Sequence, residues 1–73
     1  MKFIIYNTSQ QTTNLISSIK SDLQLVPDWD IEELYRFLVK FYKEGICRRH
    51  DFQLINNVLS VYLHGTLLFE VTE

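Results

Sequence analysis

FQLINNVLSVYLHGTLLFEV, residues 52–71, is the only long segment of the chain with a clear two-residue period. Successive side chains of a β-strand point to opposite faces, so residues two apart share a face. The period predicts three consecutive strands with one apolar face that packs against a core. The expected core residues of these strands are Leu54, Leu59, Val61, Leu67 and Phe69.

Two turns divide this segment. Asn56-Asn57 suits a two-residue hairpin turn, because Asn tolerates the positive φ that such a turn requires. A two-residue turn at His64-Gly65 would pair the core residues of the middle strand with the wrong face of the last strand. We therefore expect a three-residue loop, either Leu63-His64-Gly65 or His64-Gly65-Thr66, which restores apolar pairing.

The N-terminal part of the chain predicts a strand and a first helix. Residues 2–7 contain a short apolar run and are expected to form the strand. Thr8 and Gln11 have the spacing of a capping box, which favours the start of a helix. The apolar residues at helical spacing that follow are Leu15, Ile16, Ile19 and Leu23.

A second helix follows the linker at residues 24–28. Asp30 is the expected N-cap, and Glu33 completes its capping box. Gly45 is expected to end the helix in the left-handed conformation. The expected buried residues of this helix are Ile31, Leu34, Leu38, Phe41 and Tyr42.

The order of strand, helix, helix and three strands predicts an α+β fold. Two antiparallel helices return the chain to the end of the sheet where the first strand finished, so the second strand runs antiparallel to the first. We expect a two-layer sandwich in which two helices cover one face of a four-stranded antiparallel sheet. Residues 1–73 are expected to form a single domain.

Length and composition limit the class of protein. A chain of 73 residues has a marginal core, so a second subunit is an expected source of stability. Cys47 is the only cysteine and there are two histidines, so we expect no internal disulfide, no metal site and no cofactor. No run approaches the roughly 20 apolar residues of a membrane span, and the N-terminal apolar run is too short for a signal peptide. A cytoplasmic protein without a membrane partner is expected.

The sheet face opposite the predicted helices is rich in large apolar residues. Contiguous exposed apolar patches commonly mark protein interfaces. The alternative is that a small sheet curls enough to share both faces with its core. Ile4 joins this face if Phe3 and Ile5 point inward. The predicted protein-interface residues are Tyr6, Ile55, Val58, Tyr62 and Leu68.

A basic stripe forms the second candidate site. It contains five of the seven Lys and Arg residues, and such a run can meet phosphates or an acidic partner. The alternative is a solvated helix face, because acids at a helix start and bases at its end complement the macrodipole. The residues of the basic stripe are Arg36, Lys40, Lys43, Arg48 and Arg49.

Cys47, His50 and Asp51 are the residue types of a thiol nucleophile, its base and an orienting acid. They lie within five consecutive residues of a short connection, whereas catalytic partners usually converge from separate elements. We therefore predict no catalytic residues and do not expect an enzyme.

The order of elements is similar to that of the RelE-like ribosome-dependent toxins. The resemblance lies in topology and not in a motif. That family relies on basic and aromatic residues of the sheet and on a basic C-terminal end, whereas this chain ends with Glu70-Val71-Thr72-Glu73. The resemblance therefore implies a related fold and transfers no residue roles.

These patterns favour a small protein-protein interaction module, a binder, inhibitor or adaptor that self-associates as a dimer through the apolar sheet face. The first alternative is binding of nucleic acid or an acidic partner through the basic stripe. An RNase-like or thiol enzyme is the third class. Salt dependence separates the first two, because phosphate contacts weaken steeply with salt and apolar contacts do not.

Overall fold

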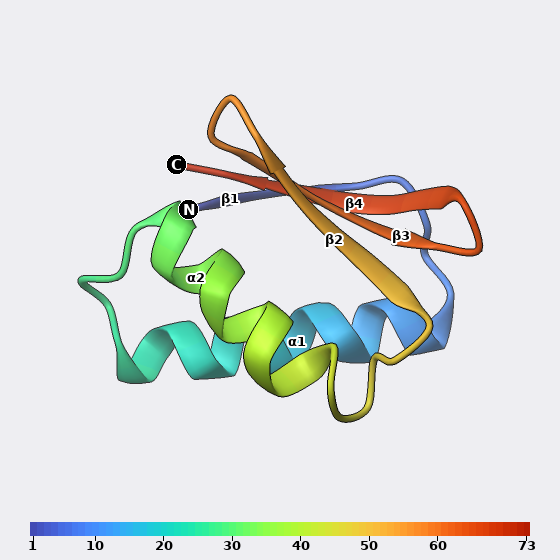
Figure 1. The fold of residues 1–73 in the computed structure, drawn as a ribbon, viewed down its shortest axis with the longest axis horizontal. Helices are drawn as coiled ribbons and strands as arrows, with labels where there is room; N and C mark the ends of the chain where they lie inside the picture. The colour runs from blue at the N-terminus through green and yellow to red at the C-terminus, as the bar shows by residue number, and fades with distance from the viewer.

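A computed structural model describes the whole chain, residues 1–73. Its elements are β1 (Lys2–Ile5), α1 (Gln10–Leu25), α2 (Ile31–Phe37), the π-helical turn η1 (Leu38–Tyr42), β2 (His50–Ile55), β3 (Val58–Leu63) and β4 (Thr66–Thr72). The strands form one antiparallel sheet in the order β1-β4-β3-β2. Both helices lie on one side of this sheet (Figure 1). The predicted α+β fold is confirmed. None of the helices combines the length and apolarity needed to cross a bilayer.

Two tight turns connect the last three strands. Asn56 and Asn57 have φ values of 53° and 62°, so the predicted two-residue hairpin turn is confirmed. His64-Gly65 also forms a two-residue turn, with φ values of 51° and 80°. The prediction of a three-residue loop between β3 and β4 is therefore wrong.

A bulge inside β4 corrects the register that this short turn imposes. Tyr62 pairs with Leu67, whereas the preceding Val61 pairs with Phe69. Leu68 is thus an extra residue in β4, and two residues of β4 oppose one residue of β3. The register of β3 and β4 is therefore corrected by an extra residue within β4 and not by an extra residue in the loop.

The bulge changes which leucine enters the core. Leu68 is only 4% exposed and Phe69 is fully buried, whereas Leu67 is half-buried beside Tyr62. The prediction that Leu68 lies on the face opposite the helices is wrong, and so is the prediction that Leu67 faces the core. Strict alternation fails here because both bulge residues turn toward the helices.

Polar caps define the start of each helix. Ser9, and not Thr8, caps α1, because its hydroxyl accepts a hydrogen bond from the Thr12 backbone N–H. The predicted capping box of α2 is confirmed. The Asp30 carboxylate accepts from the Glu33 backbone N–H at 2.9 Å, and the Glu33 carboxylate accepts from the Asp30 N–H at 3.2 Å.

The second helix ends in a π-helical turn, which the sequence pattern did not predict. The Lys43 N–H donates to the Leu38 carbonyl, five residues back, at 2.9 Å. The wider turn keeps Tyr42 in the core but leaves Phe41, predicted to be buried, 57% exposed. Gly45 is not left-handed as expected. A Cβ there would lie 2.8 Å from the Phe41 carbonyl oxygen, so glycine permits this close approach.

The core fills the space between the sheet and the helices. The Tyr42 hydroxyl links the two helices, because it bonds to Asp22 and Ser18 of α1. Burial and the hydrogen bond to Asp22 raise the pKa of Tyr42 to about 12. The largest fully buried side chains are Phe69, Ile19, Leu34, Leu38, Leu59, Val61 and Val71.

The bulge can be tested with two adjacent leucines. We expect Leu68→Ala to lower the free energy of unfolding by about 2–5 kcal/mol, because it removes a buried side chain. The matched change Leu67→Ala removes a half-buried side chain and should cost clearly less. Urea denaturation of both variants measures the difference. A larger loss for Leu67→Ala would indicate strict alternation and contradict the bulge.

Candidate functional site

The first candidate surface is the outer face, defined as the sheet face that the helices leave uncovered (Figure 1). The strand register places its residues in rows across the sheet. The middle row is Ile4, Glu70, Ser60 and Gln53. The row at one end of the sheet contains the pairs Lys2–Thr72 and Val58–Ile55. The row at the other end contains Leu67, Tyr62 and Asp51, in which Tyr62 pairs with both neighbours.

Of the five residues predicted for the interface, the register places Ile55, Val58 and Tyr62 on the outer face, and Tyr6 reaches this face through its hydrogen bond to Glu70. Tyr6 is 57% exposed and Ile55 is 61% exposed, and Val58 and Tyr62 are half-buried. The fifth, Leu68, is in the core, and its neighbour Leu67 takes its place beside Tyr62. The sequence could not identify Leu67 as an outer-face residue, because the bulge at Leu68 interrupts the two-residue period of β4.

A polar row divides the apolar residues of the outer face. Glu70, Ser60 and Gln53 separate the Tyr62 end from the Ile55 end. The Tyr6 hydroxyl donates to the Glu70 carboxylate at 2.7 Å, and this hydrogen bond raises the pKa of Tyr6. The outer face is therefore a mixed surface with aromatic residues, and such a composition is typical of non-obligate interfaces.

The basic stripe separates into residues with different partners. Arg36 forms an ion pair with Glu32, and the Lys40 ammonium lies 5.5 Å from the centre of the Phe41 ring. Lys43 donates to the backbone carbonyls of Arg48 and His50 and to the Asp51 carboxylate. Lys43 therefore stabilises the loop before β2. Arg48 and Arg49 are exposed and form no ion pair.

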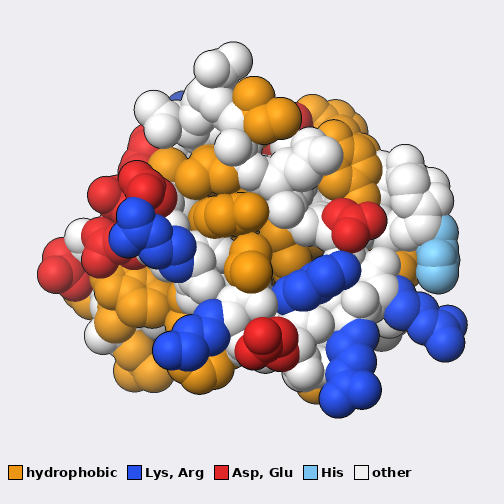
Figure 2. All heavy atoms as spheres, viewed as in Figure 1, with side chains coloured by type: hydrophobic (Ala, Val, Ile, Leu, Met, Phe, Trp, Pro, Cys, Tyr) orange, Lys and Arg blue, Asp and Glu red, His pale blue; other side chains and the backbone are white.

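Lys and Arg side chains are spread over the side of the molecule that Figure 2 presents, with Asp and Glu among them. The basic stripe is thus no continuous cationic surface. Trp29, Phe37 and Phe41 form a row of aromatic rings beside its helical part, with ring centres 5.2 and 5.0 Å apart. The exposure of Phe41 follows from the π-helical turn, so sequence periodicity could not identify this row.

Arg48 and Arg49 line a concave site that we name the corner pocket. It has a volume of about 360 Å³ and lies between the start of α1, the loop before β2 and the β3–β4 turn. The polar side chains of the corner pocket are Gln11, Arg48, Arg49, His50 and His64. The sequence separates these residues by up to 53 positions, so no motif spacing could have grouped them.

His50 is the buried member of the corner pocket. It is 5% exposed, and its Nδ1 atom has no hydrogen-bond partner. Burial lowers the pKa of His50, and the positive charges of Lys43 and His64 lower it further, while Asp51 opposes them. The imidazole is therefore neutral at pH 7.

This shift predicts a pH dependence of stability. The unfolded chain binds a proton on His50 near the ordinary pKa of 6.5, whereas the folded chain binds it only at lower pH. The free energy of unfolding should therefore fall as the pH drops below about 6.5. Thermal denaturation between roughly pH 7.5 and pH 5.5 measures the slope, which His50→Gln should reduce. An identical slope in His50→Gln would contradict the assignment.

Cys47 lies next to the corner pocket but is not an activated nucleophile. The thiol is 3% exposed, and burial raises its pKa, so it stays protonated at neutral pH. The Asp51 carboxylate bonds to Lys43 and not to His50. The three residues therefore do not form a thiol–imidazole–carboxylate chain. No cluster of three His, Cys, Asp or Glu side chains has the arrangement of a metal site.

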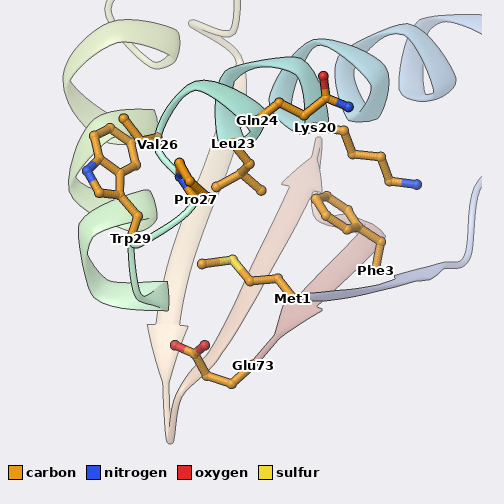
Figure 3. Close-up of a pocket in the computed structure, with 9 residues that line it drawn as sticks. All are labelled: Met1, Phe3, Lys20, Leu23, Gln24, Val26, Pro27, Trp29 and Glu73. Carbon is orange, nitrogen blue, oxygen red and sulfur yellow. The ribbon is translucent and has the colours of Figure 1, made fainter.

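A larger cavity, of about 570 Å³, lies at the opposite end of α1 (Figure 3). Phe3, Leu23 and Trp29 form part of its wall, and its charged groups already have partners. The Lys20 ammonium lies 5.1 Å from the centre of the Phe3 ring, and the Glu73 carboxylate accepts from the Ile31 N–H at 2.7 Å. Beyond these groups, the cavity offers apolar surface and the amide of Gln24.

Comparisons with known proteins do not assign the chain to a family. No family model matches it, and neither the curated proteins nor the solved structures contain a match.

Proposed function

We propose that this chain is a small, non-enzymatic, cytoplasmic interaction module whose outer face binds a second copy of the chain. The observation that carries the proposal is the absence of helices over the outer face, to which all four strands contribute apolar side chains. Tyr6 and Tyr62 supply the large amphipathic side chains that are enriched at protein interfaces.

Charge complementarity supports a second copy as the occupant. Lys2 lies on the edge strand β1 at one end of the outer face, and Asp51 lies on the edge strand β2 at the other end. These two residues occupy diagonally opposite corners. A two-fold axis along the other diagonal brings Lys2 of one copy to Asp51 of the second copy, and this contact then occurs twice.

The size of the outer face indicates reversible association. Four strands spaced about 4.8 Å apart, each about 20 Å long, offer a few hundred Å² per copy. Stable interfaces bury about 800 Å² per partner, so this area is at the low end. We therefore expect a dimer that dissociates in the micromolar range rather than an obligate one.

A pair of aromatic residues on opposite sides of the molecule tests the proposal. We expect Tyr62→Asp to dissociate the dimer, because it places a charge among apolar side chains of the interface. The matched change Phe41→Asp alters an aromatic residue of the helical side that is 57% exposed, and it should leave the dimer intact. Sedimentation velocity at high micromolar concentration measures both. Dissociation by Phe41→Asp alone would place the interface on the helices.

A charge exchange tests the two-fold arrangement. Lys2→Glu and Asp51→Lys should each weaken the dimer, because each opposes like charges across the axis. The double variant restores opposite charges and should recover most of the lost affinity. The ion pair of Asp51 with Lys43 is exposed, so its loss should change the melting temperature little. A double variant weaker than both single variants would exclude this axis.

Binding to nucleic acid through the basic stripe is the second candidate function. The unpaired Arg48 and Arg49 favour it, whereas the partners of Arg36 and Lys43 count against a continuous phosphate-binding surface. The two functions differ in salt dependence. Affinity for nucleic acid falls steeply with salt, and dimerisation through the outer face should change little.

A further inference from the structure

The corner pocket combines positive charge with an unpaired buried group, and it is separate from the outer face. Arg48 and Arg49 contribute positive charge to its wall, His50 and His64 contribute imidazoles, and no Asp or Glu contributes to it. Arg48 and Arg49 have no carboxylate partner elsewhere. The wall therefore has an excess of hydrogen-bond donors and positive charge.

The start of α1 adds to this charge. Gln11 lies in the first turn of the helix and lines the pocket. The backbone N–H groups of Gln10 and Gln11 donate to no other group of the chain, and the first turn contains no acidic residue. The N-terminus of a helix with free N–H groups favours an anion.

The buried His50 indicates a ligand independently of the helix N-terminus. A buried polar atom without a partner is costly, so most such atoms in folded proteins have one. His50 is 95% buried, lines the pocket and has an unpaired Nδ1 atom. Lys43 fixes the backbone of the loop by donating to the His50 carbonyl, so the imidazole is held at the pocket wall.

We propose that the corner pocket binds the terminal phosphate group of a phosphomonoester. Donors from three separate segments, the start of α1, the loop before β2 and the β3–β4 turn, can reach a tetrahedral group from several directions. A planar carboxylate would use fewer of them. The second pKa of such a phosphate is about 6, so at pH 7 it carries close to two negative charges, which Arg48 and Arg49 can balance.

The shape of the site favours a terminal phosphate over the phosphodiesters of a nucleic-acid backbone. A volume of about 360 Å³ accommodates the phosphate and a small part of its carrier. A backbone phosphodiester has esters on two sides and requires a groove that continues in both directions. The carrier can be a small molecule or a phosphorylated side chain, and both present the same terminal group.

The test is an NMR titration of the whole chain with inorganic phosphate at pH 7, compared with sodium chloride at equal ionic strength. We expect saturable shifts with phosphate alone, at the amide signals of Gln10, Gln11 and residues 48–50. Replacing Arg48 and Arg49 by Ala removes two charge-assisted donors and should weaken binding about tenfold or more. The matched change Arg36→Ala removes an arginine outside the pocket and should leave the affinity unchanged.

His50 provides a second readout. The negative charge of a bound phosphate favours the imidazolium, so phosphate should raise the pKa of His50. This effect has the same direction as that of Asp51 and opposes those of Lys43 and His64. Titration of the imidazole signals with and without phosphate measures the change. Shifts equal to those with chloride, or binding unaffected by the two arginine changes, would overturn the proposal.

Three further probes identify the carrier. Free O-phosphoserine that binds as tightly as a phosphoserine peptide supports a small phosphomonoester, and tighter binding of the peptide supports a phosphorylated protein. The unphosphorylated peptide should not bind. A single-stranded oligonucleotide without a terminal phosphate that binds more tightly than either would overturn the proposal in favour of a backbone phosphodiester.

Discussion

The extra residue at Leu68 determines how the sheet and the core fit together. The two-residue turn at His64-Gly65 imposes a register that would place Glu70 opposite the buried Leu59. The bulge shifts β4 by one residue, so that Val71 pairs with Leu59 and Phe69 with Val61. The carbonyl of Leu68 also accepts the N–H groups of Tyr6 and Asn7, at 2.9 and 3.0 Å. One irregularity therefore aligns the core and fixes the end of β1 on the sheet.

The loop between the second helix and β2 depends on a different constraint. The π-helical turn and the close approach at Gly45 end the helix abruptly, and Lys43 then holds the returning chain through two backbone carbonyls. This arrangement leaves the Lys43 ammonium unavailable to a partner but presents Arg48 and Arg49 beside the start of α1. Lys43, which the sequence groups with the basic stripe, thus stabilises the loop that lines the corner pocket.

The sequence predicts what depends on local chemistry and periodicity. The capping box at Asp30, the Asn56-Asn57 turn and the α+β order follow from near neighbours, and all three are confirmed. The inward direction of Leu68 and the exposure of Phe41 do not. A bulge and a π-helical turn each insert one extra residue into the regular repeat, and no residue type marks the position of that insertion. The corner pocket could not be predicted either, since its wall combines residues from Gln11 to His64 that meet only in three dimensions.

The exposed area of the chain is close to that of a typical monomer of its mass. A monomer of 8.7 kDa exposes about 4,700 Å² in a typical structure, and this chain exposes 4828 Å². The expectation that a second subunit adds stability to so short a chain stays a prediction. The tyrosines of the outer face and the arginines of the corner pocket are not among the buried core residues, so substitutions there should cost less stability than substitutions at Leu68 or Phe69. Substitutions of these tyrosines and arginines can therefore test the binding of a partner with little change in the stability of the fold.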